Sequence, residues 1–157
     1  MTTYIYTDGS AINNTDKKKR RAGSAFLVRS DNKDIYLSGY YQNDSTNNVA
    51  ELMAVYSAYC WMRHHKNIFH KKICFKSDSE YLIKIFTKVN SYKANKELIE
   101  KIMAIETTFM DDGFNLSYKH VKAHTKKTDT DSIANALVDK TAKDCAKSGE
   151  RIKKHFE

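Results

Sequence analysis

The sequence predicts a mixed α/β protein folded as one domain. Runs rich in Tyr, Ile, Val and Thr near the N-terminus are typical of β-strands, and apolar residues at helical spacing follow from Val49 and again from Leu98. Strands and helices then alternate, so the predicted order of elements is β-β-β-α-β-α-α-β-α. A chain of 157 residues is long enough to bury its own core. We therefore expect one domain over residues 1–150 and a charged, frayed tail over residues 151–157.

Three strands open the chain. The first begins at Tyr4 and is expected to end on Asp8, because Asp8-Gly9 is a turn signal. The second and third are predicted over residues 22–28 and 34–41, and strands joined this closely are expected to pair antiparallel. The polar segment between the first two contains the cationic run Lys17, Lys18, Lys19, Arg20 and Arg21. This run is a solvated hairpin loop, a localisation signal or a phosphate-contacting segment, and we favour phosphate contact.

The rest of the chain alternates between helices and strands. Helices are predicted over residues 46–65, from residues 78–80 onward, and over residues 95–110 and 132–149. Strands are predicted over residues 71–77 and 114–121, and a polar loop over residues 123–131 carries His124.

Four acids fall at the ends of these elements, namely Asp8, Glu51, Asp78 and Asp139. Asp8 and Asp78 end strands that a crossover helix makes parallel neighbours, and Glu51 lies in the first turn of that helix. Each acid has a structural alternative: a turn for Asp8, a capping box with Asn48 for Glu51, an N-cap for Asp78, and a pair with Lys143 for Asp139. These alternatives do not explain why all four converge on one end of the sheet.

A cluster of carboxylates predicts a metal site. Carboxylates held close together are hard to keep ionised unless cations neutralise them. Oxygen ligands select hard cations, so we expect two Mg²⁺ ions, with Mn²⁺ as a substitute. Two such ions about 4 Å apart can activate water and stabilise the leaving oxygen of an in-line displacement at phosphorus. The predicted reaction is therefore hydrolysis of a phosphodiester.

Four stretches of the sequence together resemble one known family. They are YTDGSAINN, STNNVAELMAVYSAY, FKSDSEYLIKIF and HVKAHTKKTDTDSIANALVDKTAK. Their motifs and order are similar to those of the catalytic domain of type 1 ribonuclease H. The resemblance implies a ribonuclease H-like fold, an α/β architecture whose mixed five-stranded sheet has the order 3-2-1-4-5, with the first three strands antiparallel and helices on both faces.

The resemblance also implies an activity and the residues that perform it. The expected reaction is endonucleolytic cleavage of the RNA strand of RNA/DNA hybrids, leaving 5′-phosphate and 3′-hydroxyl ends. Asp8, Glu51, Asp78 and Asp139 correspond to the metal-binding acids, and His124 to a histidine that assists phosphate chemistry or product release. The alternatives are another nuclease of the same fold and a non-catalytic hybrid-binding module. The complete set of acids argues against the second alternative.

Substrate contacts are implied in the same way. Asn14, Asn47 and Asn48 match positions that contact 2′-hydroxyl groups in the minor groove of the hybrid, and Thr46 and Asn95 match a phosphate pocket for the DNA strand. The sequence also departs from the family. The basic handle is reduced to the link over residues 90–94, and Asp44 or a neighbour replaces the usual arginine of the phosphate pocket. The cationic run from Lys17 to Arg21 is the expected substitute for the missing handle, and Lys122, Lys126 and Lys127 form a second group.

Composition bounds the partners and the compartment. A net charge of +8 favours a polyanionic partner such as the hybrid. Cys60, Cys74 and Cys145 are widely spaced and are expected to be free thiols in a reducing compartment, the cytoplasm or nucleus. We expect neither a membrane span nor an obligate protein partner, and hence a monomer. The loop around His124 resembles copies encoded by large DNA viruses, which suggests such a source.

Overall fold

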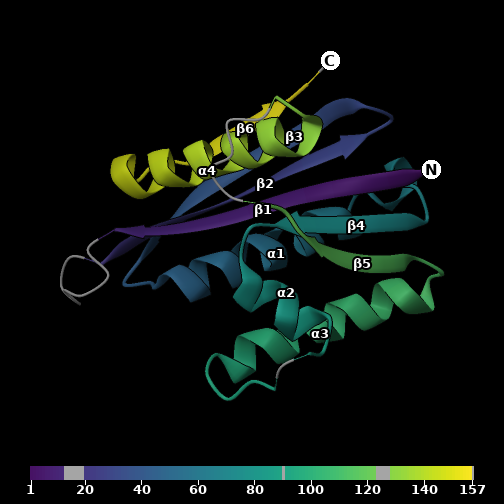
Figure 1. The fold of residues 1–157 in the computed structure, drawn as a ribbon, viewed down its shortest axis with the longest axis horizontal. Coiled ribbons are helices and arrows are strands. Elements are labelled where there is room, and N and C mark those ends of the chain that lie inside the picture. Colours follow the sequence, from purple (N-terminus) through teal and green to yellow (C-terminus); the bar gives the residue numbers. More distant parts are fainter. Residues whose placement is uncertain (13–19, 90, 123–127, 157) are drawn as a thin grey trace.

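A mixed sheet with helices on both faces forms the body of the molecule (Figure 1). The computed structural model describes residues 1–12, 20–89, 91–122 and 128–156. Within these residues the sheet has six strands in the order β5-β4-β1-β2-β3-β6. The strands are β1 (Thr2–Ile12), β2 (Arg21–Ser30), β3 (Lys33–Asn43), β4 (Lys72–Ser77), β5 (Asn115–His120) and β6 (Ile152–His155). The predicted α/β class and the order 3-2-1-4-5 of the five expected strands are confirmed, with one strand more than we expected.

Strand β1 lies at the centre of the sheet and is longer than predicted. It pairs antiparallel with β2 as far as Ile12, opposite Arg21, whereas its parallel pairing with β4 ends at Tyr6, opposite Lys76. The prediction that the strand ends at Asp8 is therefore wrong. Neither Asp8 nor Gly9 has a positive φ, so this Asp-Gly pair forms no turn and stays in the ladder with β2. Asp8 consequently lies just beyond the point where β1 and β4 part.

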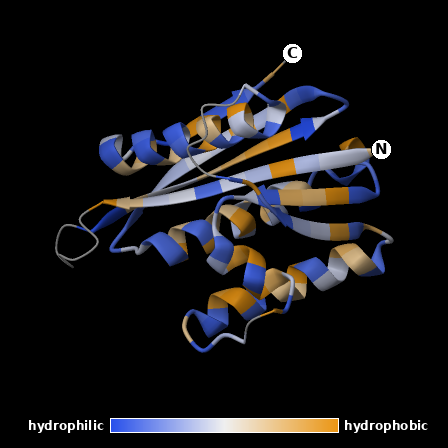
Figure 2. Ribbon diagram, viewed as in Figure 1, coloured by the Kyte–Doolittle hydropathy of each residue, from blue (hydrophilic) through white to orange (hydrophobic). Residues whose placement is uncertain are grey.

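Helices cover both faces of the sheet. On one face lie α1 (Asn47–Arg63), α2 (Glu80–Phe86) and α3 (Lys96–Asp111), and on the other lies α4 (Thr130–Ser148); a short 3₁₀ helix (Lys66–Ile68) follows α1. The face under α1 holds the larger, aromatic-rich core, and the face under α4 holds a smaller one. In Figure 2 apolar residues alternate with hydrophilic ones along these helices, as expected for elements with one buried side. No described helix is both long enough and apolar enough to cross a bilayer.

Close packing of α4 on the sheet depends on Gly23 of β2. A Cβ at this position would lie 1.9 Å from the carbonyl oxygen of Ala142. No side chain fits in that space, so α4 approaches the backbone of β2 directly. This contact fixes the height of α4 above the sheet and, with it, the position of Asp139.

The C-terminal tail is part of the sheet. Strand β6 pairs antiparallel with β3, from Tyr36 opposite His155 to Gly39 opposite Ile152. The expectation of a frayed tail and of a five-stranded sheet is therefore wrong. An edge strand presents unpaired backbone groups, and β6 satisfies those of β3. Phe156 adds an apolar contact to the smaller core, which explains why so charged a segment is ordered.

Candidate active site

Asp8 lies on the central strand β1, just beyond its last pair with β4, and is shielded from solvent. Its side chain is only 3% exposed, and one carboxylate oxygen, Oδ1, accepts a hydrogen bond from the backbone N–H of Gly9 at 2.9 Å. A buried carboxylate with so few partners is costly in its ionised form. Burial and the nearby charge of Asp78 accordingly raise the pKa of Asp8 to about 8.

Glu51 reaches Asp8 because α1 packs directly on Gly9. A Cβ on Gly9 would lie 2.3 Å from both the carbonyl carbon of Ala50 and the amide nitrogen of Glu51. The helix begins earlier, with Thr46 as N-cap, whose hydroxyl accepts a hydrogen bond from the amide of Val49 at 3.3 Å. The capping alternative for Glu51 is therefore not what the structure shows. Its Oε2 atom is buried and has no hydrogen-bond partner.

Asp78 follows the end of β4 and is held by α4. The N-cap of α2 is Ser79, whose hydroxyl accepts from the amide of Leu82, so Asp78 does not serve as that cap. Asn135 of α4 donates from Nδ2 to Oδ2 of Asp78 at 3.2 Å. Asn135 is itself buried, and its Oδ1 has no hydrogen-bond partner. The opposite helix layer thus orients the carboxylate of Asp78.

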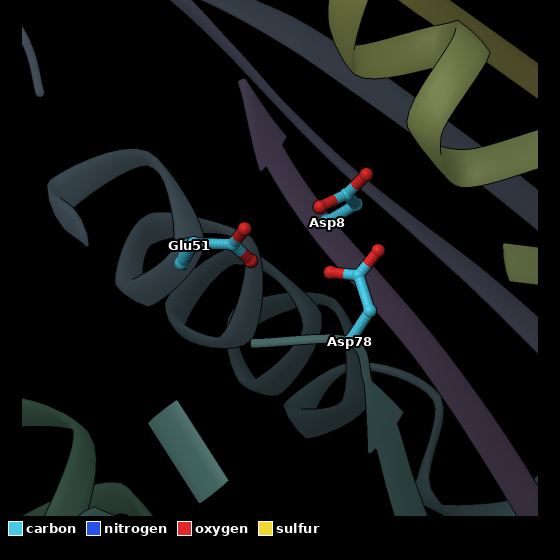
Figure 3. A group of neighbouring side chains, drawn as sticks. All are labelled: Asp8, Glu51 and Asp78. Carbon is cyan, nitrogen blue, oxygen red and sulfur yellow. The ribbon is translucent and has the colours of Figure 1, made fainter. Parts of the chain in front are cut away.

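Asp8, Glu51 and Asp78 form one compact group (Figure 3). One carboxylate oxygen from each lies within 4.8 Å of the others. Burial, followed by the charge of Asp8, raises the pKa of Glu51 well above its usual value. Three carboxylates at such separations repel each other when ionised, and a divalent cation relieves that repulsion.

The donor set of this group fits a hard divalent cation. All the donors are carboxylate oxygens, which select Mg²⁺, Mn²⁺ or Ca²⁺ rather than a softer metal. The buried Oε2 of Glu51 lacks a partner, which is the condition expected of a ligand atom in a metal-free site. The residues present therefore fit a metal.

Asp139 lies beside this group rather than within it. From α4 it faces Asp8 closely enough to contribute to the raised pKa of that residue. Its Oδ2 also accepts from Nζ of Lys143 at 3.0 Å, so the pairing considered from the sequence is present. Asp139 is half-buried and is held between a lysine and the acid cluster.

Comparison with known proteins identifies the family. The model of the RNase H family matches residues 1–147. The chain belongs to the RNase H family.

Individual relatives agree with the RNase H assignment. A probable ribonuclease H of Acanthamoeba polyphaga mimivirus is 31% identical over 122 residues, which cover 69% of this chain and 51% of that protein. The chain thus matches about half the length of this curated relative. LC11-RNase H1, solved in complex with an RNA/DNA hybrid, has a TM-score of 0.74 at 23% identity and covers 92% of this chain and 96% of its own. RNase H1 of Halobacterium salinarum has a TM-score of 0.68 at 18% identity, covering 92% and 97% of the two chains.

The described residues among those expected to contact substrate lie at the starts of α1 and α3. Asn47 and Asn48 are exposed there, and Oδ1 of Asn47 accepts from the backbone N–H of Ala11 at 2.8 Å. Asn95, the N-cap of α3, has a left-handed backbone, and its Nδ2 donates to the hydroxyl of Tyr81 at 3.2 Å. A cavity of about 390 Å³ between these helix starts is lined by Val49, Asn95, Lys96, Glu97, Leu98 and Lys101. Asn14, Lys17, Lys18, Lys19, His124, Lys126 and Lys127 lie outside the described residues.

Sequence reasoning missed a polar brace next to the acids. Lys76, two residues before Asp78, donates to both carboxylate oxygens of Asp131 at 2.8 and 2.9 Å. Tyr6, two residues before Asp8, donates to the same carboxylate. Lys76 also lies over the ring of Tyr4 at 4.4 Å. The parallel pairing of β1 and β4, with alternate residues on the same face, could have placed Tyr6 beside Lys76. Nothing in the sequence around Asp131 indicated that it would pair with them.

His120 is a second residue near the site that the sequence did not single out. It ends β5 opposite Ser77, and its Nε2 lies 3.2 Å from the backbone oxygen of Asp78. The side chain is exposed, unlike the acids beside it. It therefore borders the cluster from the β5 side.

Proposed function

We propose that this protein hydrolyses the RNA strand of RNA/DNA hybrids, leaving 5′-phosphate and 3′-hydroxyl ends. The observation that carries the proposal is the convergence of Asp8, Glu51 and Asp78, with mutually close oxygens and a partnerless buried Glu51 Oε2. Membership of the RNase H family supports the same reaction. Acids this close do not stabilise the fold by themselves, because burial and then their mutual repulsion raise the pKa of Asp8 and of Glu51.

Asp8, Glu51, Asp78 and Asp139 would hold two Mg²⁺ ions, for which Mn²⁺ could substitute. When bound, such ions supply Lewis acidity and activate water for attack at phosphorus. The protein's own residues orient the ligands: Gly9 fixes Asp8, the packing of α1 on Gly9 fixes Glu51, and Asn135 fixes Asp78. His124, in the segment before α4, would assist proton transfer or product release.

Recognition of the hybrid would use the start of α1 and the segments around it. Exposed Asn47 and Asn48, together with Asn14, would contact 2′-hydroxyl groups in the minor groove. Thr46 and Asn95 would bind a phosphate of the DNA strand, and the cavity beside Asn95 carries Lys96 and Lys101, which suit an anion. Asp44, which stands where an arginine of the phosphate pocket is expected, pairs with Arg20 at 3.3 Å. Arg20 would then supply the guanidinium for that pocket.

One comparison tests the activity and separates it from its alternatives. Matched RNA/DNA, RNA/RNA and DNA/DNA duplexes are incubated with the protein in Mg²⁺ or in excess chelator. We expect cleavage of RNA in the hybrid alone, in Mg²⁺ alone, with product ends identified by end-labelling. Asp78→Asn should abolish cleavage, and Asp111→Asn, an exposed acid at the end of α3, is the charge-matched control.

The other outcomes each point elsewhere. Hybrid binding without cleavage would support a non-catalytic module, and cleavage of DNA/DNA would support another nuclease of this fold. We also propose that the protein acts as a monomer, without an obligate protein partner, inside a cell whose thiols are reduced, and that its source is a large DNA virus. Sedimentation at concentrations used for the cleavage assay tests the first of these statements.

A further inference from the structure

A groove away from the acids separates α1 from the β3–β6 edge of the sheet. It has a volume of about 460 Å³, which lies within the range of small-molecule sites, about 300 to 1,000 Å³. Strands β2 and β3 form its floor with Phe26, Tyr36, Ser38 and Tyr40. The wall from α1 is formed by Met53, Tyr56, Ser57, Cys60, Trp61 and His64, and Arg151 stands at the β6 side. None of the four candidate metal ligands lines it.

The aromatic wall of the groove is already ordered. Tyr36 stacks on Trp61 with ring centroids 4.5 Å apart and planes 4° apart, and Trp61 stacks in turn on His65 at 4.1 Å. Phe26 packs against both Tyr36 and Trp61. Because Tyr36 and His65 both stack on Trp61, a planar ligand would meet the edges of a preformed aromatic wall, and little side-chain entropy would be lost on binding.

The groove also has hydroxyl groups in its lining, those of Ser38, Tyr40 and Ser57 among them. The Tyr40 hydroxyl donates to the backbone oxygen of Met53 at 3.0 Å and accepts from Oγ of Ser57 at 2.7 Å. A hydroxyl oxygen has two lone pairs, so the Tyr40 oxygen can accept one further hydrogen bond. The groove therefore combines an apolar surface with fixed polar atoms, which is the usual composition of a small-molecule site.

The charged side chain that lines the groove, Arg151, is cationic. Lys153 and His155 lie opposite Ser38 and Tyr36, and directly opposed residues of an antiparallel pair project from the same face. The His155 ring indeed lies 4.7 Å from that of Tyr36. Arg151 is close enough to Tyr40 to oppose the rise in its pKa that burial causes. Among the described residues that line the groove, none is acidic.

We propose that this groove is a second binding site, which takes one nucleotide unit, a planar base joined to a phosphate. The base would lie against the aromatic wall beside Tyr40, and the phosphate would meet Arg151 and Lys153. Aromatic contact with bases and attraction of the phosphate backbone by cations are two interactions that bind single-stranded nucleic acids. The unit comes either from a single strand that extends from a longer nucleic acid or from a free nucleotide. The site does not require cleavage at the acid cluster.

Trp61 supplies a direct readout, because the sequence contains 1 tryptophan and this residue lines the groove. Wild-type protein in chelator is titrated with oligothymidylate about ten nucleotides long, a length within the range of single-strand sites. Thymidine 5′-monophosphate distinguishes the free nucleotide from the strand, and inorganic tripolyphosphate tests charge without a base. We expect a saturable change of Trp61 fluorescence with a thymidine probe and none with tripolyphosphate.

Matched variants of β6 locate the contact. Arg151→Ala and Lys153→Ala should each weaken oligothymidylate binding and lower its salt slope by about 0.7, the value for the loss of one phosphate contact on a single strand. Lys154→Ala, which alternates to the opposite face and whose Nζ lies over Phe156, should leave binding unchanged. Alkylation of half-buried Cys60 should be slowed by bound oligothymidylate, whereas Cys74 and Cys145 are buried and stay unreactive.

Several results would overturn the proposal. These are an unchanged fluorescence with both thymidine probes, an equal response to tripolyphosphate, or equal weakening by Lys153→Ala and Lys154→Ala. A tighter complex with the oligomer than with the monophosphate assigns the unit to a strand, and equal affinities assign it to a free nucleotide. Hybrid cleavage is measured on the same preparations. Its absence in wild-type protein with a normal Trp61 response would refute the proposed function and leave this site standing.

Discussion

Gly9 decides how closely α1 approaches β1, and therefore whether Glu51 reaches Asp8. The backbone atoms of Ala50 and Glu51 occupy the volume that any side chain at this position would need. Gly9 is thus required for lack of space and not for a turn, since its φ is negative or extended like that of its neighbours in the ladder. A residue that packs two elements together also sets the geometry of the acid cluster.

Gly9→Ala should destabilise the fold and reduce cleavage together. Its Cβ would lie 2.3 Å from backbone atoms of α1, so the helix must shift, at a cost of about 1 to 3 kcal/mol or more. Urea unfolding gives the first quantity, and steady-state cleavage of the hybrid gives the second. Ser10→Ala, on the next residue, is the control and should change neither. A Gly9→Ala protein with full stability and activity would contradict the close approach.

Asp8→Asn should abolish cleavage and stabilise the metal-free protein at neutral pH. The pKa of Asp8 is about 8 in the folded protein and near 3.8 in an unfolded chain. Between these values the folded state binds more protons than the unfolded state, so the free energy of unfolding falls as pH rises. The Asn side chain does not titrate, so the free energy of unfolding of the variant should fall much less as pH rises. Urea unfolding in chelator from pH 4 to 9 measures the effect.

Saturating Mg²⁺ gives the complementary measurement for Asp8. The cation should stabilise wild-type protein against unfolding, because it binds the folded acids and neutralises them. Asp8→Asn should show a smaller stabilisation, since one ligand oxygen of the cluster is lost. Equal stabilisation of the two proteins would remove Asp8 from the metal site.

At the scale of elements, α4 is attached to the sheet at both ends. Its later turns pack on Gly23, and its first turn is held by the brace of Lys76, Tyr6 and Asp131. Burial opposes ionisation of Asp131, yet its hydrogen bonds from Lys76 and Tyr6 lower its pKa below the usual value. Tyr6 and Lys76 each lie two residues before an acid, Asp8 and Asp78 respectively. The brace therefore holds the first turns of α4 in the position from which Asn135 contacts Asp78.

Lys76→Met should destabilise the protein by about 1 to 3 kcal/mol, because it leaves a partly buried carboxylate without its main partner. Lys72→Met is the control, since Lys72 projects from the same face of β4 and is exposed. Adding Asp131→Asn to Lys76→Met should recover part of the loss, which a double-mutant cycle measures. A Lys76→Met variant as stable as Lys72→Met would show that the brace carries no net stabilisation.

Local patterns predicted the elements, and non-local pairing accounts for what was missed. Helical spacing from Val49 located α1 within two residues, because periodicity is a property of the segment itself. The extension of β1 past Asp8 depends on its pairing with β2, and the order of β6 depends on its pairing with β3. Neither pairing can be read from the sequence of one segment alone. Asp8, Glu51 and Asp78 were placed together through the crossover rule. Lys76 and Asp131 are 55 residues apart, and nothing in either segment connects them.

At the scale of the whole molecule, the positive charge that favours a polyanionic partner is spread over dispersed lysines, because the chain has no basic handle. The net charge is +8, and the segment between α2 and α3 is a short link rather than a basic element. The cationic run Lys17–Lys19 lies between β1 and β2, the strand pair that extends beyond Asp8. Hybrid binding should therefore depend on dispersed lysines and fall steeply with salt.

Replacing Lys17, Lys18 and Lys19 by Ala should weaken hybrid binding and flatten its salt dependence, with little change in the saturated cleavage rate. Each phosphate contact contributes about one unit to the salt slope, so the loss is resolved between roughly 50 and 200 mM salt. Binding is measured in chelator, so that cleavage does not interfere.

The control triple variant replaces Lys33, Lys66 and Lys72, which carry the same total charge at the opposite end of the sheet from Asp8. Lys66 there forms an exposed pair with Asp112 and lies 5.1 Å from the centroid of the Phe109 ring, and the loss of these surface contacts costs little stability. If net charge alone governed association, both triple variants would lower the slope equally. If the run between β1 and β2 contacts phosphates, the control keeps the wild-type slope and the Lys17–Lys19 variant loses up to about three units. An unchanged slope in both would make the run a solvated loop.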